Sequence, residues 1–285
     1  MRRLDGFLQG DYRTMFRGYG LDLADIREYV AGDDVRHIDW NVTARMDTPY
    51  VREYLEDREV TAHFLLDMSP SVDFGTTTAL KRDLLIDFVA VLARLLVRHG
   101  NRVGAVVYGK GVEHVIPAGG GRMQVLRLVD ELEKHPRLET APATALADLL
   151  ETGARAIRRR SLVFVISDFF TTPGWEKPLT LLARRHEVLA IRLVDPRERE
   201  LPDIGMVVMN DAETGEHLFV DTSDKRFRMR FADVVARREA ALAQSFRRAG
   251  VDTLELSTEE DLVRSIVRFA GMRKARRSQA RAAVA

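Results

Sequence analysis

From residue 61 onward, short apolar runs alternate with longer amphipathic segments. The apolar runs predict buried strands at 61–67, 102–109, 161–168, 187–195 and 251–256. Apolar residues recur every three or four positions in the intervening segments, which predicts helices at 79–98, 122–134, 145–159, 175–185, 224–249 and 259–271. Residues 112–119 are expected to pair with the strand before them. Residues 206–221 are expected to form a hairpin that turns at Glu213, Thr214 and Gly215.

Strands that alternate with helices predict a doubly wound α/β domain, with a mostly parallel sheet and helices on both faces. We place this domain at residues 61–271, preceded by an N-terminal segment, 1–60, that packs on it. A basic tail, 272–285, follows. In sheets of this kind, ligands bind beyond the carboxyl ends of the strands. Two of the predicted strands end on an aspartate, Asp67 and Asp168, so chemistry is expected at that edge.

Composition narrows the possible functions. The chain has 285 residues, of which 46% are hydrophobic, so it can bury a substantial core. Its 44 basic and 43 acidic residues leave a net charge of +1, which argues against a dedicated nucleic-acid binder. The absence of cysteine excludes disulfides, zinc ribbons and thiol catalysis, and a reducing cytoplasm is the expected compartment. The most apolar stretch, 84–97, is too short and too charged to span a membrane.

The near-zero net charge conceals a gradient along the chain. Residues 1–60 carry a formal charge of −4, residues 61–271 are neutral, and residues 272–285 carry +5. The basic tail is expected to be a solvated chain end. An alternative is that it forms an arm that contacts an acidic partner or nucleic acid.

The loop after the first predicted strand is rich in oxygen donors. Asp67, Ser69 and Ser71 form a D-x-S-x-S pattern between an apolar strand and a helix. One carboxylate and two hydroxyls on a tight loop suit a hard divalent cation such as Mg²⁺. Asp168 and Thr144 would add a carboxylate and a hydroxyl at the same edge. Serine, threonine and aspartate before a helix also serve as N-caps, so that alternative stays open for both loops.

This set resembles the metal-ion-dependent adhesion site of the von Willebrand factor A family. The resemblance implies one divalent cation, Mg²⁺ or else Mn²⁺ or Ca²⁺, held by Asp67, Ser69, Ser71, Thr144 and Asp168. It implies that the hydroxyls bind the cation directly and that the carboxylates bind directly or through water. The family's usual T-D-G is replaced here by Ser167, Asp168 and Phe169. Thr140 lies near Thr144 and is an alternative to it.

The N-terminal segment carries a second resemblance. Residues 20–59 are similar to the signature of the bacterial domain of unknown function 58, whose members resemble von Willebrand factor A domains. The matching residues are Arg27-Glu28-Tyr29, Gly32-Asp33-Asp34, Arg36, Ile38-Asp39-Trp40 and Thr43-Ala44-Arg45. The resemblance implies a MoxR-type AAA+ ATPase as partner. It also implies a chaperone-like role in maturing or remodelling a client protein.

Two interpretations of this segment remain open. It is either a folded extension of the domain or a docking surface for the ATPase, and both can hold together. Arg36, Asp39 and Arg45 would form an ion-pair network that clamps Trp40 against the sheet. The candidate docking residues are Arg27, Asp33, Asp34, Arg36, Asp39, Trp40 and Arg45.

The leading interpretation is a non-enzymatic, Mg²⁺-dependent protein-interaction module. The alternative from another class is a metal-dependent, phosphatase-like hydrolase that uses Asp67. A haloacid dehalogenase-type phosphatase is disfavoured because Ser69 stands where that chemistry needs a second aspartate. Residues 104–111 mimic a phosphate loop, but Gly111 replaces the required Ser or Thr, so no intrinsic ATPase is expected. A third interpretation is nucleic-acid binding through residues 272–285.

Overall fold

The computed structural model describes residues 26–30, 33–46, 48–52, 60–77, 79–138, 141–210 and 215–268. The chain divides into two compact units, with the boundary between Val60 and Thr61. The alternative ligand Thr140, the turn residues 213–214 and the tail 272–285 lie outside the described residues.

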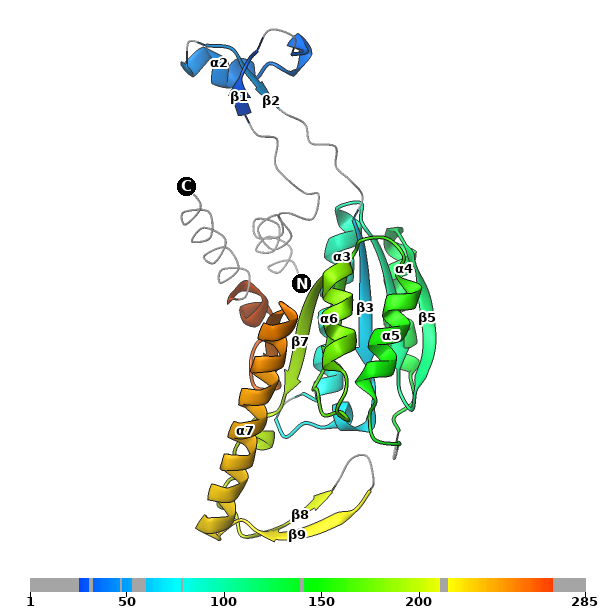
Figure 1. The fold of residues 1–285 in the computed structure, drawn as a ribbon, viewed down its shortest axis with the longest axis vertical. Coiled ribbons are helices and arrows are strands. Elements are labelled where there is room, and N and C mark those ends of the chain that lie inside the picture. Colours follow the sequence, from blue (N-terminus) through cyan, green and yellow to red (C-terminus); the bar gives the residue numbers. More distant parts are fainter. Residues whose placement is uncertain are drawn as a thin grey trace. The chain divides into compact units, whose positions relative to one another are not determined.

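The larger unit is built on a six-stranded sheet in the order β10-β7-β6-β3-β4-β5 (Figure 1). The strands are β3 Thr61–Asp67, β4 Arg102–Tyr108, β5 Val112–Gly119, β6 Leu162–Ser167, β7 Glu187–Val194 and β10 Asp252–Ser257. All neighbouring pairs are parallel except β4 and β5, which are antiparallel. The predicted doubly wound, mostly parallel sheet is therefore confirmed.

Helices cover both faces of this sheet. They are α3 Lys81–Arg98, α4 Gly121–Lys134, α5 Leu146–Ala156, α6 Glu176–Arg185 and α7 Lys225–Ala249, and residues 262–268 are also helical. α3 packs with α4, whereas α5 packs with α6 and α6 with α7. Phe64 of β3 stacks on Phe164 of β6, and Phe88 of α3 meets Phe164 edge-on. The next residue along β3, Leu65, belongs to the core formed with α5 and α6. Alternate residues of a central strand thus face different helical layers, which explains its unbroken apolar sequence.

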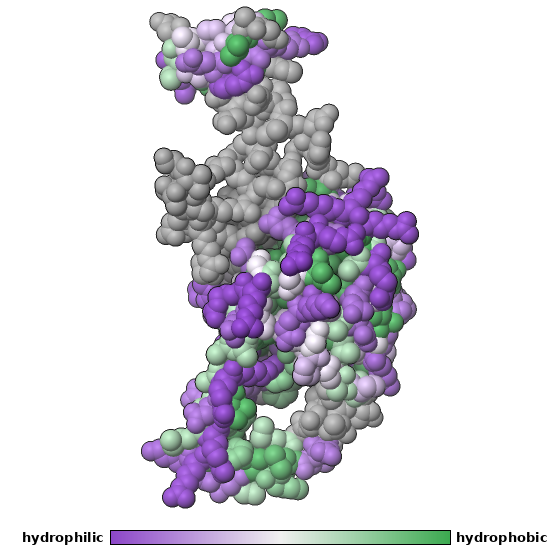
Figure 2. Space-filling view, viewed as in Figure 1, coloured by the Kyte–Doolittle hydropathy of each residue, from purple (hydrophilic) through white to green (hydrophobic). Residues whose placement is uncertain are grey.

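A hairpin projects beyond the carboxyl edge of this sheet (Figure 1). It consists of β8 Met206–Asn210 and β9 His217–Asp221, which are antiparallel, as predicted. Phe219 is paired with Val208, and both side chains are more than half exposed. Figure 2 shows apolar residues gathered over this hairpin.

The smaller unit contains a short antiparallel pair, β1 Ile26–Glu28 with β2 Tyr50–Arg52, together with η1 Val35–His37 and α2 Trp40–Met46. Arg36 pairs with Asp34, and the Asp39 carboxylate accepts from the amides of Asn41 and Val42 at the start of α2. Trp40 is 68% exposed. Turn and cap contacts thus engage Arg36 and Asp39 within this unit. The clamp of Trp40 against the sheet would join the two units and stays a prediction. None of the described helices combines the length and the apolar character that a membrane crossing needs.

Candidate functional site

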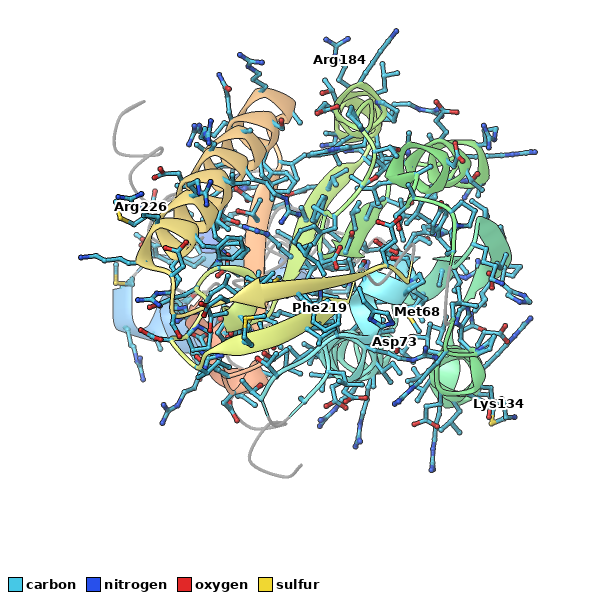
Figure 3. All side chains as sticks on the ribbon, turned by 90° about the horizontal axis from the view of Figure 1, so that it is seen from below. Met68, Asp73, Lys134, Arg184, Phe219 and Arg226 are labelled. Atoms are coloured by element: carbon cyan, nitrogen blue, oxygen red, sulfur yellow. The ribbon has the colours of Figure 1, made fainter. Side chains whose placement is uncertain are left out.

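Two adjacent strands of the sheet bring Asp67 and Asp168 to the same edge. Asp67 is the last residue of β3, and Asp168 directly follows Ser167, the last residue of β6. Because these strands are parallel neighbours, their carboxyl ends lie together. Both aspartates are fully buried, and their charges interact. Figure 3 looks onto this edge from below, with Met68 labelled on the loop after β3.

Hydrogen bonds fix the loop that carries the two serines. The Ser69 amide donates to Asp67 Oδ1 at 3.1 Å, and Ser167 Oγ donates to Asp67 Oδ2 at 2.6 Å. The hydroxyl oxygens of Ser69 and Ser71 are 3.2 Å apart, and Ser69 is fully buried. The loop therefore presents two hydroxyls side by side next to a buried carboxylate.

The helix-cap alternative does not account for these hydroxyls. The short helix η2 Pro70–Asp73 follows Ser69, but the Ser69 side chain makes no capping hydrogen bond to it. α3 begins only at Lys81, and its N-cap residue is Leu80. Buried polar groups in proteins generally serve a bonding purpose. The two hydroxyls instead bond within the loop, to each other and, for Ser69, to the Asp67 carboxylate.

Thr144 is joined to the loop that follows β6. Its side chain is buried, and its backbone oxygen accepts from the Thr172 amide at 2.9 Å and from Thr171 Oγ1 at 2.7 Å. The N-cap position of α5 is occupied by Ala145, so the Thr144 hydroxyl is not needed there. These bonds hold the Thr144 loop against the segment that begins at Asp168.

Phe169 stands where the T-D-G sequence of the metal-ion-dependent adhesion site has glycine. It adopts the backbone conformation that glycine favours. Its φ is +58°, which costs a side-chain-bearing residue about 1–2 kcal/mol. Its ring packs 5.5 Å from Trp175 and 4.9 Å from Phe246, measured between centroids. Aromatic packing offsets the strain, and the turn after Asp168 keeps its shape without the glycine.

Lys81 is a member of this site that sequence reasoning missed. Its side chain is 0% exposed, and Nζ donates to Asp168 Oδ2 at 2.7 Å and to Glu198 Oε1. Asp168 Oδ1 accepts from the Phe170 amide at 2.9 Å. Lys81 falls on the same helical face as the core residues Leu84 and Phe88, and that position was the signal available in the sequence.

Burial and mutual charge set the protonation behaviour of the cluster. Burial, together with the charge of Asp168, raises the pKa of Asp67 to about 6. Burial opposes the charge on Lys81, but the two neighbouring carboxylates outweigh it and raise the pKa of the ammonium. Burial also raises the pKa of Glu198, although Lys81 acts against that effect.

A third aspartate, Asp195, follows β7 and has a structural role. It is fully buried and accepts from both the amide and the hydroxyl of Thr76, at 2.7 and 2.6 Å, and from Thr258 Oγ1 at 2.8 Å. Burial opposes its ionisation, but these hydrogen bonds dominate and hold its pKa below the usual value. Asp195 therefore ties the segments after η2 and β10 to the sheet.

The donor set at the edge fits a small hard cation. Carboxylate and hydroxyl oxygens of Asp67, Ser69 and Ser71 lie within one buried loop, with no soft ligand among them. Across the described residues, no three acidic, histidine or cysteine side chains form a group suited to a metal ion. Binding of a cation here would therefore depend on the serine hydroxyls. Asp168 could act as a ligand only if the cation competed with Lys81 for its carboxylate.

Solved structures with a similar fold include two proteins from Bacteroides species. The conserved hypothetical protein BatB from Bacteroides thetaiotaomicron has a TM-score of 0.50 at 13% identity, over 75% of this chain and 98% of that one. An aerotolerance-related membrane protein from Bacteroides fragilis has the same TM-score and identity, over 76% and 99%. The SpRpn10 VWA domain has a TM-score of 0.41 at 12% identity, over 73% and 93%. The likeness to the two Bacteroides structures shows a shared fold.

Relatives by sequence include uncharacterized proteins of Mycobacterium tuberculosis and Mycobacterium bovis. Each is 38% identical over 273 residues, which cover 96% of this chain and 86% of the relative. The family model described as protein of unknown function DUF58 matches residues 25–241. That match includes residues 25–59 of the signature segment and every residue of the candidate site. The chain therefore belongs to the DUF58 family.

Proposed function

We propose that this protein is a non-enzymatic protein-interaction module whose binding edge depends on Mg²⁺. The observation that carries the proposal is the Asp67 loop, where the hydroxyls of Ser69 and Ser71 lie 3.2 Å apart without capping a helix. A buried, hydrogen-bonded carboxylate beside two such hydroxyls is a suitable donor set for a hard cation.

The low charge of this donor set supports a binding role. Asp67 supplies one formal negative charge, while Ser69, Ser71 and Thr144 are neutral, and Asp168 is shared with Lys81. Bound Mg²⁺ would supply an electrophilic position that accepts a carboxylate from a partner protein. Asp67 orients the loop through the Ser69 amide, and Ser167 orients Asp67.

The proposed partner is a MoxR-type AAA+ ATPase, with which the module would act on a client protein in a chaperone-like way. The support is membership of the DUF58 family together with the signature segment. In the part of the signature segment that the structure describes, Arg27 pairs with Asp33 and Arg36 pairs with Asp34 at the surface. The candidate docking residues remain Arg27, Asp33, Asp34, Arg36, Asp39, Trp40 and Arg45.

The test measures capture of a purified MoxR-type AAA+ ATPase by the tagged full chain, with Mg²⁺ or with a chelator. We expect capture in Mg²⁺ that is lost with chelator and in Asp67→Ala. Asp87→Ala, an exposed aspartate on α3, serves as the matched control and should behave as wild type. If the wild type and both variants captured the ATPase equally well in chelator, the dependence of the binding edge on metal would be contradicted. Turnover of a generic phosphomonoester that disappears in Asp67→Asn would instead favour the hydrolase.

A further inference from the structure

Lys81 lies against a carboxylate that the proposed cation would otherwise use. Nζ contacts Asp168 Oδ2 at 2.7 Å and also Glu198 Oε1, and the lysine side chain is 0% exposed. The rings of Phe74 and Phe170 lie 5.6 and 5.5 Å from Nζ. The ammonium is thus enclosed by two carboxylates and two aromatic faces.

Other charged groups reach the same cluster. Asp67 interacts electrostatically with Asp168, and Arg238 interacts with Asp168 and Glu198. The Arg238 guanidinium lies 3.2 Å from the centroid of the Phe170 ring. Two basic side chains, Lys81 and Arg238, therefore lie at this edge together with three carboxylates. The carboxylates are those of Asp67, Asp168 and Glu198.

Packing alone does not explain a lysine at this position. Replacing both members of a buried ion pair by apolar side chains of similar volume often costs little or no stability. A buried ammonium is expensive to desolvate and is tolerated only with close partners. Since Asp168 follows the strand beside β3, the charge of Lys81 bears directly on the cation-binding loop.

We propose that the Lys81 ammonium is a resident cation of this edge, which engages Asp168 and keeps the affinity of the Asp67 loop for Mg²⁺ low. This inference rests on the proposed function. Binding of Mg²⁺ then depends mainly on Asp67, Ser69 and Ser71, while Asp168 acts first as the partner of Lys81. A weakly held Mg²⁺ is stabilised by the partner's carboxylate, so the cation and the partner bind together.

The first experiment compares the full-length wild type with Lys81→Met and Lys81→Arg. The melting temperature is measured in chelator and in about 10 mM Mg²⁺, and Mg²⁺ binding is measured by calorimetry. Lys81→Met should melt lower in chelator, because two buried carboxylates lose their partner. Mg²⁺ should raise its melting temperature more than that of wild type and bind about ten-fold tighter. Lys81→Arg should resemble wild type.

The outcomes separate this inference from the proposed function. If Mg²⁺ raises the melting temperature of wild type and of Lys81→Met equally, the role of Lys81 as a resident cation is refuted. The Mg²⁺-dependent binding edge then still stands. If Mg²⁺ affects Lys81→Met alone, the resident cation is supported and the metal dependence of the natural protein is refuted. If Mg²⁺ affects neither protein, both are refuted.

A second pair of variants serves if Lys81→Met does not fold. Asp168→Asn should keep the Mg²⁺ affinity of wild type within about three-fold, whereas Asp67→Asn should lose it. Equal loss in both variants would show that Asp168 is a metal ligand of the same rank as Asp67. That result would contradict the proposal that Asp168 acts first as the ion-pair partner of Lys81.

Discussion

Two regions of this protein pair acids with bases, one at the surface and one in the interior. In the smaller unit, the Arg36 and Asp34 side chains are 84% and 37% exposed. At the carboxyl edge of the sheet, Lys81 and Asp168 are both 0% exposed. Water screens the first pair, so it adds little to stability, while the second is desolvated and depends on both partners. Burial, rather than the number of charges, distinguishes the candidate site from the charged surface.

The largest effect is expected for Asp168→Ala. This change leaves the buried ammonium of Lys81 with Glu198 as its carboxylate partner, and we expect a loss of about 3 kcal/mol in the free energy of unfolding. Urea unfolding followed by circular dichroism measures it. A loss below about 1 kcal/mol would show that the Lys81–Asp168 pair contributes no more to stability than an exposed ion pair.

A smaller loss is expected for Phe169→Gly. Glycine removes the backbone strain at φ +58° but also the contacts of the ring with Trp175 and Phe246. Large-to-small core changes cost more than the strain returns, so the net loss should be about 2 kcal/mol. The matched control, Phe169→Leu, keeps the strain and part of the packing. Greater stability of the glycine variant in urea would show that the ring is not what stabilises this turn.

The two regions should respond to pH with opposite signs. Burial and Asp168 raise the pKa of Asp67 to about 6, so the folded state binds more protons than the unfolded one between the ordinary value of 3.8 and 6. Its contribution to stability is therefore greatest at low pH and falls as pH rises through that window. The hydrogen bond from Arg27 lowers the pKa of Asp33 to about 2, so its contribution is present above 3.8 and is lost as pH falls toward 2.

Carboxyl carbon NMR of the metal-free protein checks both values, with Asp67→Asn and Asp33→Asn to assign the signals. An Asp67 signal that titrates near 3.8 would show that the edge is more hydrated than its burial indicates.

The smallest effect is expected for Asp34→Asn. The carboxylate pairs with an Arg36 side chain that extends into water, and Asp34 also accepts from the Arg36 amide, a bond that asparagine can retain. The thermal melt should not change measurably. A clear fall in melting temperature would mean that surface pairing in the smaller unit matters for folding.

The fold could be read from the sequence because its signals are local. Unbroken apolar strands and amphipathic helices predicted the order of elements, and the ends of β3 and β6 located both aspartates. The role of Lys81 could not be read in this way, because its partners Asp168 and Glu198 lie far away in sequence. Phe169 shows the same limit, since the contacts that allow its unusual backbone come from Trp175 and Phe246.

Calorimetric titration of the metal-free full chain with Mg²⁺ tests whether the binding edge built on the Asp67 loop depends on Mg²⁺. We expect weak, saturable binding to the wild-type protein that is absent in Asp67→Ala and unchanged in Asp87→Ala. Binding that is absent from the wild type, or that survives in Asp67→Ala, would contradict it.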